Sequence, residues 1–205
     1  MRATGGISAL AAVGVLMTAG VWAQEGDRPS KEEFAEEVAE LARTELLEWI
    51  RDPIVIASIL EANKMHASMT PEEIERLDQE WRRQTDIDEK YMIYDLLGRQ
   101  ASIILRDKRE ESSGVITEII VMDKWGLNAA ISDATSDFYQ GDEAKYQETY
   151  LKGKGAVHVG ELEFDESTQK VQTQVSLTVV DPNDQDRVIG AVTFGIDLDR
   201  LTEGS

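Results

Sequence analysis

Residues 132–150 gather the side chains best suited to binding a small polar molecule. The segment reads Ser-Asp-Ala-Thr-Ser-Asp-Phe-Tyr-Gln-Gly-Asp-Glu-Ala-Lys-Tyr-Gln-Glu-Thr-Tyr. Aromatic rings enclose the body of a ligand, while carboxylates, hydroxyls and an ammonium group fix its polar ends. Six residues of this segment are expected to contact a ligand: Asp133, Ser136, Asp137, Tyr139, Lys145 and Tyr146.

The end of the chain offers a second group of ligand contacts. Strand alternation over 188–197 places Ile189, Ala191, Thr193, Gly195 and Asp197 on one face. The small residues of that face leave space beside the sheet, and the space ends at a carboxylate suited to an amine. The alternative is that a helix packs closely there and that Asp197 caps the last helical turn.

Gln174 belongs to the polar face of the preceding strand. If the register pairs Gln174 with Thr193, both side chains face the same cavity, whereas a slip of one residue separates them. The polar face of this strand also suits plain contact with water. We therefore expect Gln174, Thr193 and Asp197 to complete the ligand site, with the register left open.

The acids and tyrosines of segment 132–150 could also have roles other than ligand contact. Asp133, Asp137, Asp142 and Glu143 would suit calcium, but their order does not match an EF-hand loop. Acids also favour a helix start, where Asp142 and Glu143 stand. Tyrosines at helical spacing are common in a core as well as in a pocket. A calcium-stabilised domain therefore remains an alternative.

The sequence carries little that suits catalysis. His66 and His158 have no metal-ligand spacing between them, and the chain has no cysteine to act as a nucleophile. It has no Gly-x-Ser-x-Gly elbow, phosphate loop or dinucleotide fingerprint. We expect a protein that is not an enzyme and that uses neither a cofactor nor a metal.

The first residues and the net charge indicate where the protein works. Met1-Arg2, an uncharged stretch from Ala3 to Val21 and the small-residue site ending at Ala23 predict a signal peptide over residues 1–23. The alternative is an uncleaved membrane anchor. Removing Arg2 leaves 20 basic against 40 acidic residues, and such a surface repels nucleic acid and anionic membranes. We expect a periplasmic or secreted protein with no nucleic-acid partner.

The remaining chain divides by its hydrophobic period. Residues 24–30 form a linker, and residues 31–205 a single domain with a helical part (31–112) and a sheet part (113–205). Strong helix starts stand at Ser30, Asp52-Pro53 and Thr70-Pro71. The predicted helices are 31–50, 53–66, 70–82, 88–106 and 141–151. The predicted strands are 115–122, 127–131, 156–164, 170–180 and 187–196. The fold class is α+β, with N-terminal helices followed by a five-stranded antiparallel PAS-like or Cache-like sheet.

This order resembles the single Cache domain, an extracytoplasmic PAS-like sensor module. Four features over residues 30–200 carry the resemblance: the long first helix, the hairpin at 121–127, the aromatic and acidic connection, and the Gly-rich last strand closed by Asp197. The resemblance implies a pocket between the sheet and that connection. In amino-acid-binding relatives an arginine stands in the connection and an aspartate on the last strand. Lys145 and Asp197 occupy similar places here, but lysine lacks the arginine fork.

The resemblance therefore implies a sensor that captures a small polar metabolite with a carboxylate, an amine or both. It would signal through a separate membrane receptor, kinase or transporter, and it would dimerise, if at all, through the N-terminal helix. The alternative from another class is a non-catalytic structural or interaction protein whose cavity is filled by its own side chains.

Overall fold

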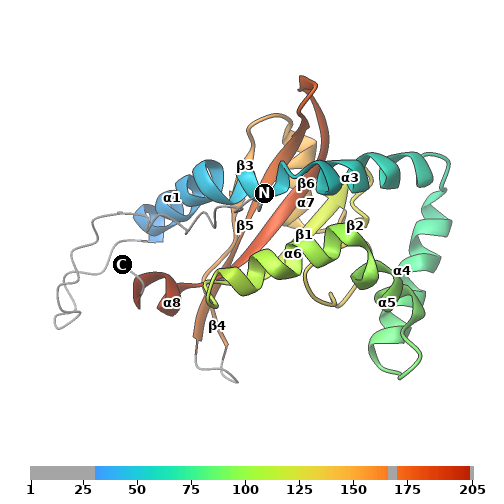
Figure 1. Ribbon diagram of the computed structural model, residues 1–205, viewed down its shortest axis with the longest axis horizontal. Coiled ribbons are helices and arrows are strands. Elements are labelled where there is room, and N and C mark those ends of the chain that lie inside the picture. The colour runs from blue at the N-terminus through green and yellow to red at the C-terminus, as the bar shows by residue number, and fades with distance from the viewer. Residues whose placement is uncertain (1–30, 166–169, 204–205) are drawn as a thin grey trace, which may run out of the picture.

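The computed structural model describes residues 31–165 and 170–203 (Figure 1). The predicted signal peptide (1–23), the linker (24–30) and the Ser30 cap lie outside the described residues. Within the described ranges, no helix combines the length and the apolar character that crossing a membrane requires.

Helices fill the first half of the chain, as predicted. Their bounds are α1 Lys31–Leu41, the π-helical segment η1 Ala42–Leu46, α2 Leu47–Ile50, α3 Pro53–Met65, α4 Pro71–Thr85, α5 Tyr91–Gly98 and α6 Gln100–Glu111. Two predicted starts have the expected caps. The Asp52 carboxylate accepts a hydrogen bond from the Ile54 amide at 2.8 Å. At Thr70 a reciprocal capping box forms, in which the Glu73 amide donates to the Thr70 hydroxyl and the Thr70 amide donates to the Glu73 carboxylate.

The prediction of one helix over 88–106 is wrong. Arg99 adopts an extended conformation (ψ 147°) directly after Gly98, which separates α5 from α6. The chain turns there, and α5 packs beside α4 while α6 lies over the sheet (Figure 1). The helix predicted over 141–151 is also shorter than expected, comprising α7 Ala144–Gln147 and the 3₁₀ turn η2 Tyr150–Lys152.

The second half forms an antiparallel sheet, which confirms the α+β class. The strands are β1 Ile116–Asp123, β2 Asn128–Ile131, β3 Val157–Val159, β4 Glu163–Asp165, β5 Lys170–Asp181 and β6 Asp184–Asp197, followed by helix α8 Leu198–Glu203. The spatial order is β2-β1-β6-β5-β3, with β4 also paired to β5. The predicted strand over 156–164, third in the chain, is thus divided into two short strands that both pair with β5, so the described sheet has six strands in place of the five predicted. Gly160, whose amide donates to the Gln174 carbonyl at 2.7 Å, lies in the interruption.

The register along β6 settles the question left open by the sequence. Thr193 pairs with Ser176, and Gln174 pairs with Gly195. Thr193, Gln174 and Gly195 therefore lie on the same face of the sheet. Ile189 departs from the predicted alternation and joins the opposite hydrophobic cluster. The cause is a register shift in which Val179 pairs with Gly190 and Val180 pairs with Val188, leaving Ile189 as the extra residue of a bulge.

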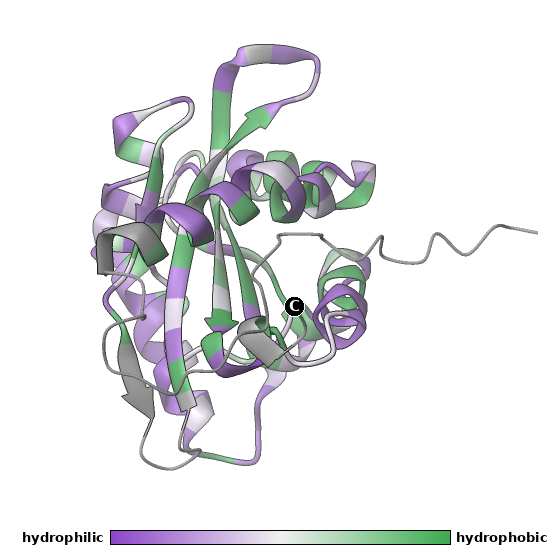
Figure 2. Cartoon of the chain, turned by 90° about the vertical axis from the view of Figure 1, so that its left-hand side faces the viewer, coloured by the Kyte–Doolittle hydropathy of each residue, from purple (hydrophilic) through white to green (hydrophobic). Residues whose placement is uncertain are grey.

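Each face of the sheet has its own hydrophobic cluster. Ile119, Val121 and Phe194 pack on the side of α3 and α6, where Val55 and Leu105 are fully buried. The opposite face of the same strands carries a second cluster, formed with side chains of α4, α5 and the crossing segment; its buried members include Ile120, Met122, Ala191, Trp81, Ile93, Phe138 and Tyr146. Figure 2 shows hydrophilic and hydrophobic residues intermixed along the helices, as expected of helices that bury one side.

Candidate functional site

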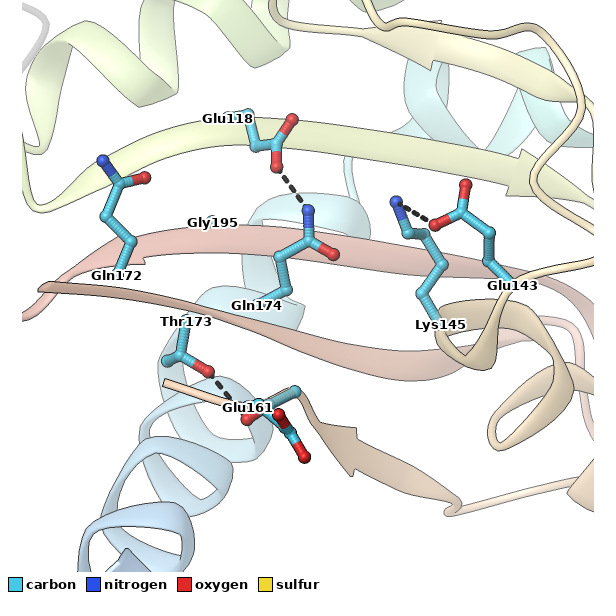
Figure 3. A pocket seen from close by; sticks show the side chains of 9 residues that line it. Glu118, Glu143, Lys145, Glu161, Gln172, Thr173, Gln174 and Gly195 are labelled. Carbon is cyan, nitrogen blue, oxygen red and sulfur yellow. Dashed lines mark hydrogen bonds and ion pairs between the residues drawn. The ribbon is translucent and has the colours of Figure 1, made fainter. Parts of the chain in front are cut away.

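A pocket of about 320 Å³ opens on the sheet face that points away from α3 and α6. Four parts of the chain form it: β1, the paired strands β5 and β6, the start of α7, and residues 160–161 (Figure 3). The lining residues are Glu118, Glu143, Lys145, Gly160, Glu161, Gln172, Thr173, Gln174 and Gly195. Its volume lies at the lower end of the range of about 300–1,000 Å³ typical of small-molecule sites.

The space at the floor of the pocket exists because Gly195 has no side chain. Gly195 lies between Glu118 of β1 and Gln174 of β5, its neighbours on the two adjacent strands. A Cβ atom at Gly195 would come within 2.8 Å of the Glu118 Cγ atom, closer than real side chains approach. Glycine at this position therefore allows the Glu118 side chain to lie across β6, where Figure 3 shows it directed toward Gln174.

The polar groups of the pocket are ordered by three contacts, the first of which is the hydrogen bond that the Thr173 hydroxyl donates to the Gly160 carbonyl at 3.0 Å. The Gln174 side-chain amide donates to the Glu118 carboxylate at 2.7 Å, and the Lys145 ammonium forms an ion pair with the Glu143 carboxylate at 3.1 Å (Figure 3). The Lys145 side chain is only 11% exposed. Because Glu161 adds a third carboxylate, the lining carries three acids and one base. This excess of negative charge favours a ligand that brings a cationic group.

Two residues expected from the sequence, Lys145 and Gln174, meet in this pocket. Tyr139 and Tyr146 lie outside the lining set. Tyr146 is buried, donates its hydroxyl proton to the Lys124 carbonyl at 2.7 Å and stacks on Tyr150 with ring centroids 5.2 Å apart. Burial raises the pKa of the Tyr139, Tyr146 and Tyr150 hydroxyls, so these groups stay protonated at neutral pH.

The early part of the crossing segment is held by helix α4 and does not line the pocket. Asp137 is buried and accepts hydrogen bonds from Arg82 at 3.1 Å and from Gln140 at 2.5 Å. Asp133 is exposed and accepts from Arg109 at 2.8 Å, and Ser136 is exposed. The Trp81 indole donates to the Thr135 carbonyl at 2.9 Å. Arg82 and Trp81 thus fix the segment against α4, and Arg109 joins its first residues to α6.

Thr193 and Asp197 lie on β6 on either side of Gly195, outside the lining set. The Thr193 hydroxyl is fully buried and hydrogen-bonds the Ser176 hydroxyl at 2.8 Å. The Asp197 carboxylate is also fully buried and accepts a hydrogen bond from the Arg200 amide at 3.1 Å, which caps α8. This is the capping arrangement that the sequence left as the alternative.

Sequence reasoning did not select five polar residues of the lining as ligand contacts: Glu118, Glu143, Glu161, Gln172 and Thr173. Glu118 did carry a signal, because it is the one charged residue in the otherwise apolar and hydroxyl-bearing run 115–122. Gln172 belongs to the same polar strand face as Gln174. In the described part of the chain, no group of three or more His, Asp or Glu residues is placed to hold a metal ion.

The arrangement defines an α+β protein with α3 and α6 over one sheet face, and with α4, α5 and the polar pocket on the other. No protein-family model matches the sequence, and no curated protein matches it either. Similar solved structures include the ligand-binding domain of the Campylobacter jejuni chemoreceptor Tlp3 in complex with 4-methylisoleucine. It is 17% identical, with a TM-score of 0.38, and the match covers 83% of this chain and 63% of that one.

Two further likenesses are of the same kind. The sensor domain of the V. cholerae histidine kinase DctB is 12% identical over 83% of this chain and 60% of that one, with a TM-score of 0.35. The ligand-binding domain of the Pseudomonas aeruginosa PAO1 amino acid chemoreceptor PctC, in complex with GABA, is 17% identical over 85% and 64%, with a TM-score of 0.39. The chain thus spans less than two thirds of each of these three domains. Two of these are ligand-binding domains of chemoreceptors and one is a sensor domain of a histidine kinase. At these identities and TM-scores, the ligand of this chain has to be inferred from its own residues.

Proposed function

We propose that the chain is an extracytoplasmic, non-catalytic sensor domain of the Cache type that captures a small polar molecule bearing an amine. The observation that carries this proposal is the pocket on the open sheet face, whose three carboxylates outnumber its one ammonium. The signal-like first 23 residues support an exported location. The sequence resemblance supports a sensor role.

Each polar group of the pocket has a place in this proposal. Glu118 and Glu161 receive the ligand's amine, because carboxylates form charge-assisted hydrogen bonds with ammonium groups. Lys145 receives a carboxylate when the ligand carries one, and it exchanges Glu143 for that group. Gln172 and Gln174 supply amide donors and acceptors to the uncharged part of the ligand.

Binding would be transmitted through the start of α7. Lys145 and Glu143 join the pocket to this short helix, whose Tyr146 packs in the second hydrophobic cluster. A ligand that separates the Lys145–Glu143 pair would therefore shift α7 against that cluster. We propose that a membrane receptor, kinase or transporter reads this shift.

A thermal-shift series with matched ligands tests the proposal. Diaminobutane, 4-aminobutyrate and succinate share a four-carbon chain and differ in their end groups. We expect the two amines to raise the melting temperature and succinate to leave it unchanged. A ligand at one hundred times its Kd adds about 2.7 kcal/mol to the free energy of unfolding. The proposal is wrong if succinate stabilises the protein more than either amine does.

Variants connect the effect to the pocket. Glu118→Gln removes the charge and keeps an oxygen acceptor for Gln174, so it should weaken amine binding and leave the fold intact. Glu110→Gln, at an exposed position on α6 outside the pocket, is the matched control and should bind as the original chain does. Equal binding by both variants would contradict the role of Glu118.

A further inference from the structure

A second hollow of about 380 Å³ lies against the opposite side of the sheet and shares no lining residue with the polar pocket. It is formed by η1 and α2, by residues 154–157, and by the β5 end of the β5–β6 hairpin. We call it the basic groove. Its accessible apolar surface comes from the partly exposed Leu47, Ala156, Val157 and Val180. Beneath them the groove is lined by buried residues of the hydrophobic cluster under α3 and α6, among them Ile50, Ile56 and Leu177.

The helical wall of the basic groove contains a backbone irregularity. Residues Ala42–Leu46 form a π-helical segment between two α-helical ones. Segments of this kind are rare and frequently mark functional sites. One extra residue in a helix rotates the side chains that follow by about 100°. The π segment therefore decides which side chains of α2 face the groove together with Arg43.

The charges of the groove differ from those of the rest of the chain. Its charged lining residues are Arg43, Arg51 and Lys154, all basic, although the chain has 40 acidic against 21 basic residues. Their ion-pair partners stand outside the lining set. Arg43 pairs with Glu36 at 3.3 Å and with Glu40 at 3.5 Å, and Lys154 pairs with Asp186 at 3.1 Å.

These ion pairs leave the cations ready to exchange partners. The Arg43 side chain is 41% exposed and the Lys154 side chain 53% exposed, and Arg51 pairs with the half-exposed Glu48 on the same helix. Exposed pairs of this kind contribute little to stability, because water already solvates both charges. A ligand carboxylate that meets arginine in a fork geometry, with its chain on an apolar surface, gains more than such a pair does.

We propose that the basic groove binds a linear aliphatic carboxylate, with its hydrocarbon chain against the partly exposed Leu47, Val157 and Val180 and its carboxylate at Arg43, Arg51 and Lys154. The apolar surface selects the chain, and the three cations select the anionic end. The chain would thus hold two ligands of opposite character on the two sides of one sheet, an amine-bearing one in the polar pocket and an anionic one in the groove.

Titration with octanoate, below its micelle concentration, tests this proposal by ¹H–¹³C NMR of isoleucine methyl groups. We expect saturable shifts at Ile50 and Ile56, which line the groove, and none at Ile93, which is buried in the other cluster. Octylamine and 1-octanol have the same chain length without the anion, and they should bind at least tenfold more weakly. Equal binding of octylamine and octanoate, or the absence of shifts at Ile50 and Ile56, would overturn the proposal.

Four variant chains locate the binding. Arg43→Gln combined with Arg51→Gln should weaken octanoate at least tenfold. Arg99→Gln removes an exposed arginine that pairs with Asp95 and lies outside the groove lining. This variant should bind octanoate as the original chain does. Ala156→Leu fills the groove and should abolish binding. Unchanged octanoate affinity in the double arginine variant or in Ala156→Leu would refute the site, whereas Glu118→Gln in the polar pocket should leave octanoate binding unaltered.

Discussion

One carboxylate, that of Asp123, joins the helical and sheet parts of the chain. Asp123 is fully buried at the end of β1. One of its oxygens accepts hydrogen bonds from the Trp125 and Leu127 amides at 2.8 and 3.0 Å, closing the turn before β2. The other oxygen lies 2.6 Å from Nδ1 of the buried His66, just past the end of α3. The hairpin between β1 and β2 is therefore anchored to a helix end that precedes it by more than fifty residues.

We expect Asp123→Ala to lower the free energy of unfolding by about 3–5 kcal/mol, the cost of removing one partner of a buried pair. The substitution leaves the His66 ring and two turn amides without their acceptor. Asp133→Ala is the matched control, because Asp133 is exposed and its pair with Arg109 should contribute about 0–1 kcal/mol. Urea unfolding measures both variants. Equal losses would show that the buried contact does not stabilise the fold.

The pocket illustrates what single residues reveal before a structure is known. Lys145 and Gln174 could be selected from sequence because charge in a crossing connection and polar alternation on a strand are local patterns. Glu118 and Glu161 could not be assigned, because their meeting depends on the strand register and on the interruption at Gly160. Asp197 shows what strand alternation does not decide. From the sequence alone, a carboxylate at the end of a strand suits a ligand pocket and a helix cap equally well.

At the scale of elements, the starts of helices were more predictable than their interruptions. Thr70-Pro71 and Asp52-Pro53 carry local capping signals, and both caps form. The break at Arg99 has no proline and no cap, with only Gly98 before it. It exists because α5 packs on α4 while α6 packs on the sheet, a tertiary requirement that a local pattern does not show.

Helices α4 and α5 are joined by the Glu80 carboxylate. It accepts hydrogen bonds from the Arg83 guanidinium at 2.8 Å, from the Gln84 amide at 2.7 Å and from the Tyr91 hydroxyl at 2.8 Å. These bonds lower the pKa of Glu80 from 4.5 to about 2, with the Arg83 contact the largest cause. Since the folded-state pKa is the lower one, the stabilisation is present above about pH 4.5 and disappears as the pH falls toward 2.

Glu80→Gln should therefore lower the melting temperature at neutral pH by an amount that shrinks between pH 4.5 and pH 2. The melting temperatures of the variant and of the original chain are measured at each pH, and one is subtracted from the other. The effects of all other titrating groups cancel in this difference. Glu75→Gln is the control, because Glu75 accepts a hydrogen bond only from the neutral Gln79 side chain among the contacts described, and its difference should stay flat. A Glu80→Gln difference that does not change with pH would contradict the assignment.

At the scale of the whole molecule, acidic residues outnumber basic ones almost two to one, giving a net charge of −19. Many of the bases are already engaged in short-range pairs along one helix, such as Arg82 with Asp78 and Arg83 with Glu80. The acidic residues in excess of the basic ones leave a net negative charge on the molecule. Their carboxylates repel one another in the compact folded state. Salt screens this repulsion more than it weakens close pairs, because the repulsion acts over longer distances.

We therefore expect the melting temperature at pH 7 to rise as sodium chloride increases from 10 mM to 500 mM. The Debye length falls from about 30 Å at 0.01 M to less than 10 Å above 0.1 M, so repulsion across the molecule is removed first. Near pH 4.4, the isoelectric point of the sequence, the net charge is close to zero and the same salt series should have little effect. A salt effect of equal size at both pH values would assign it to ion-specific solvation. A fall in melting temperature at pH 7 would show that local ion pairs outweigh the net charge.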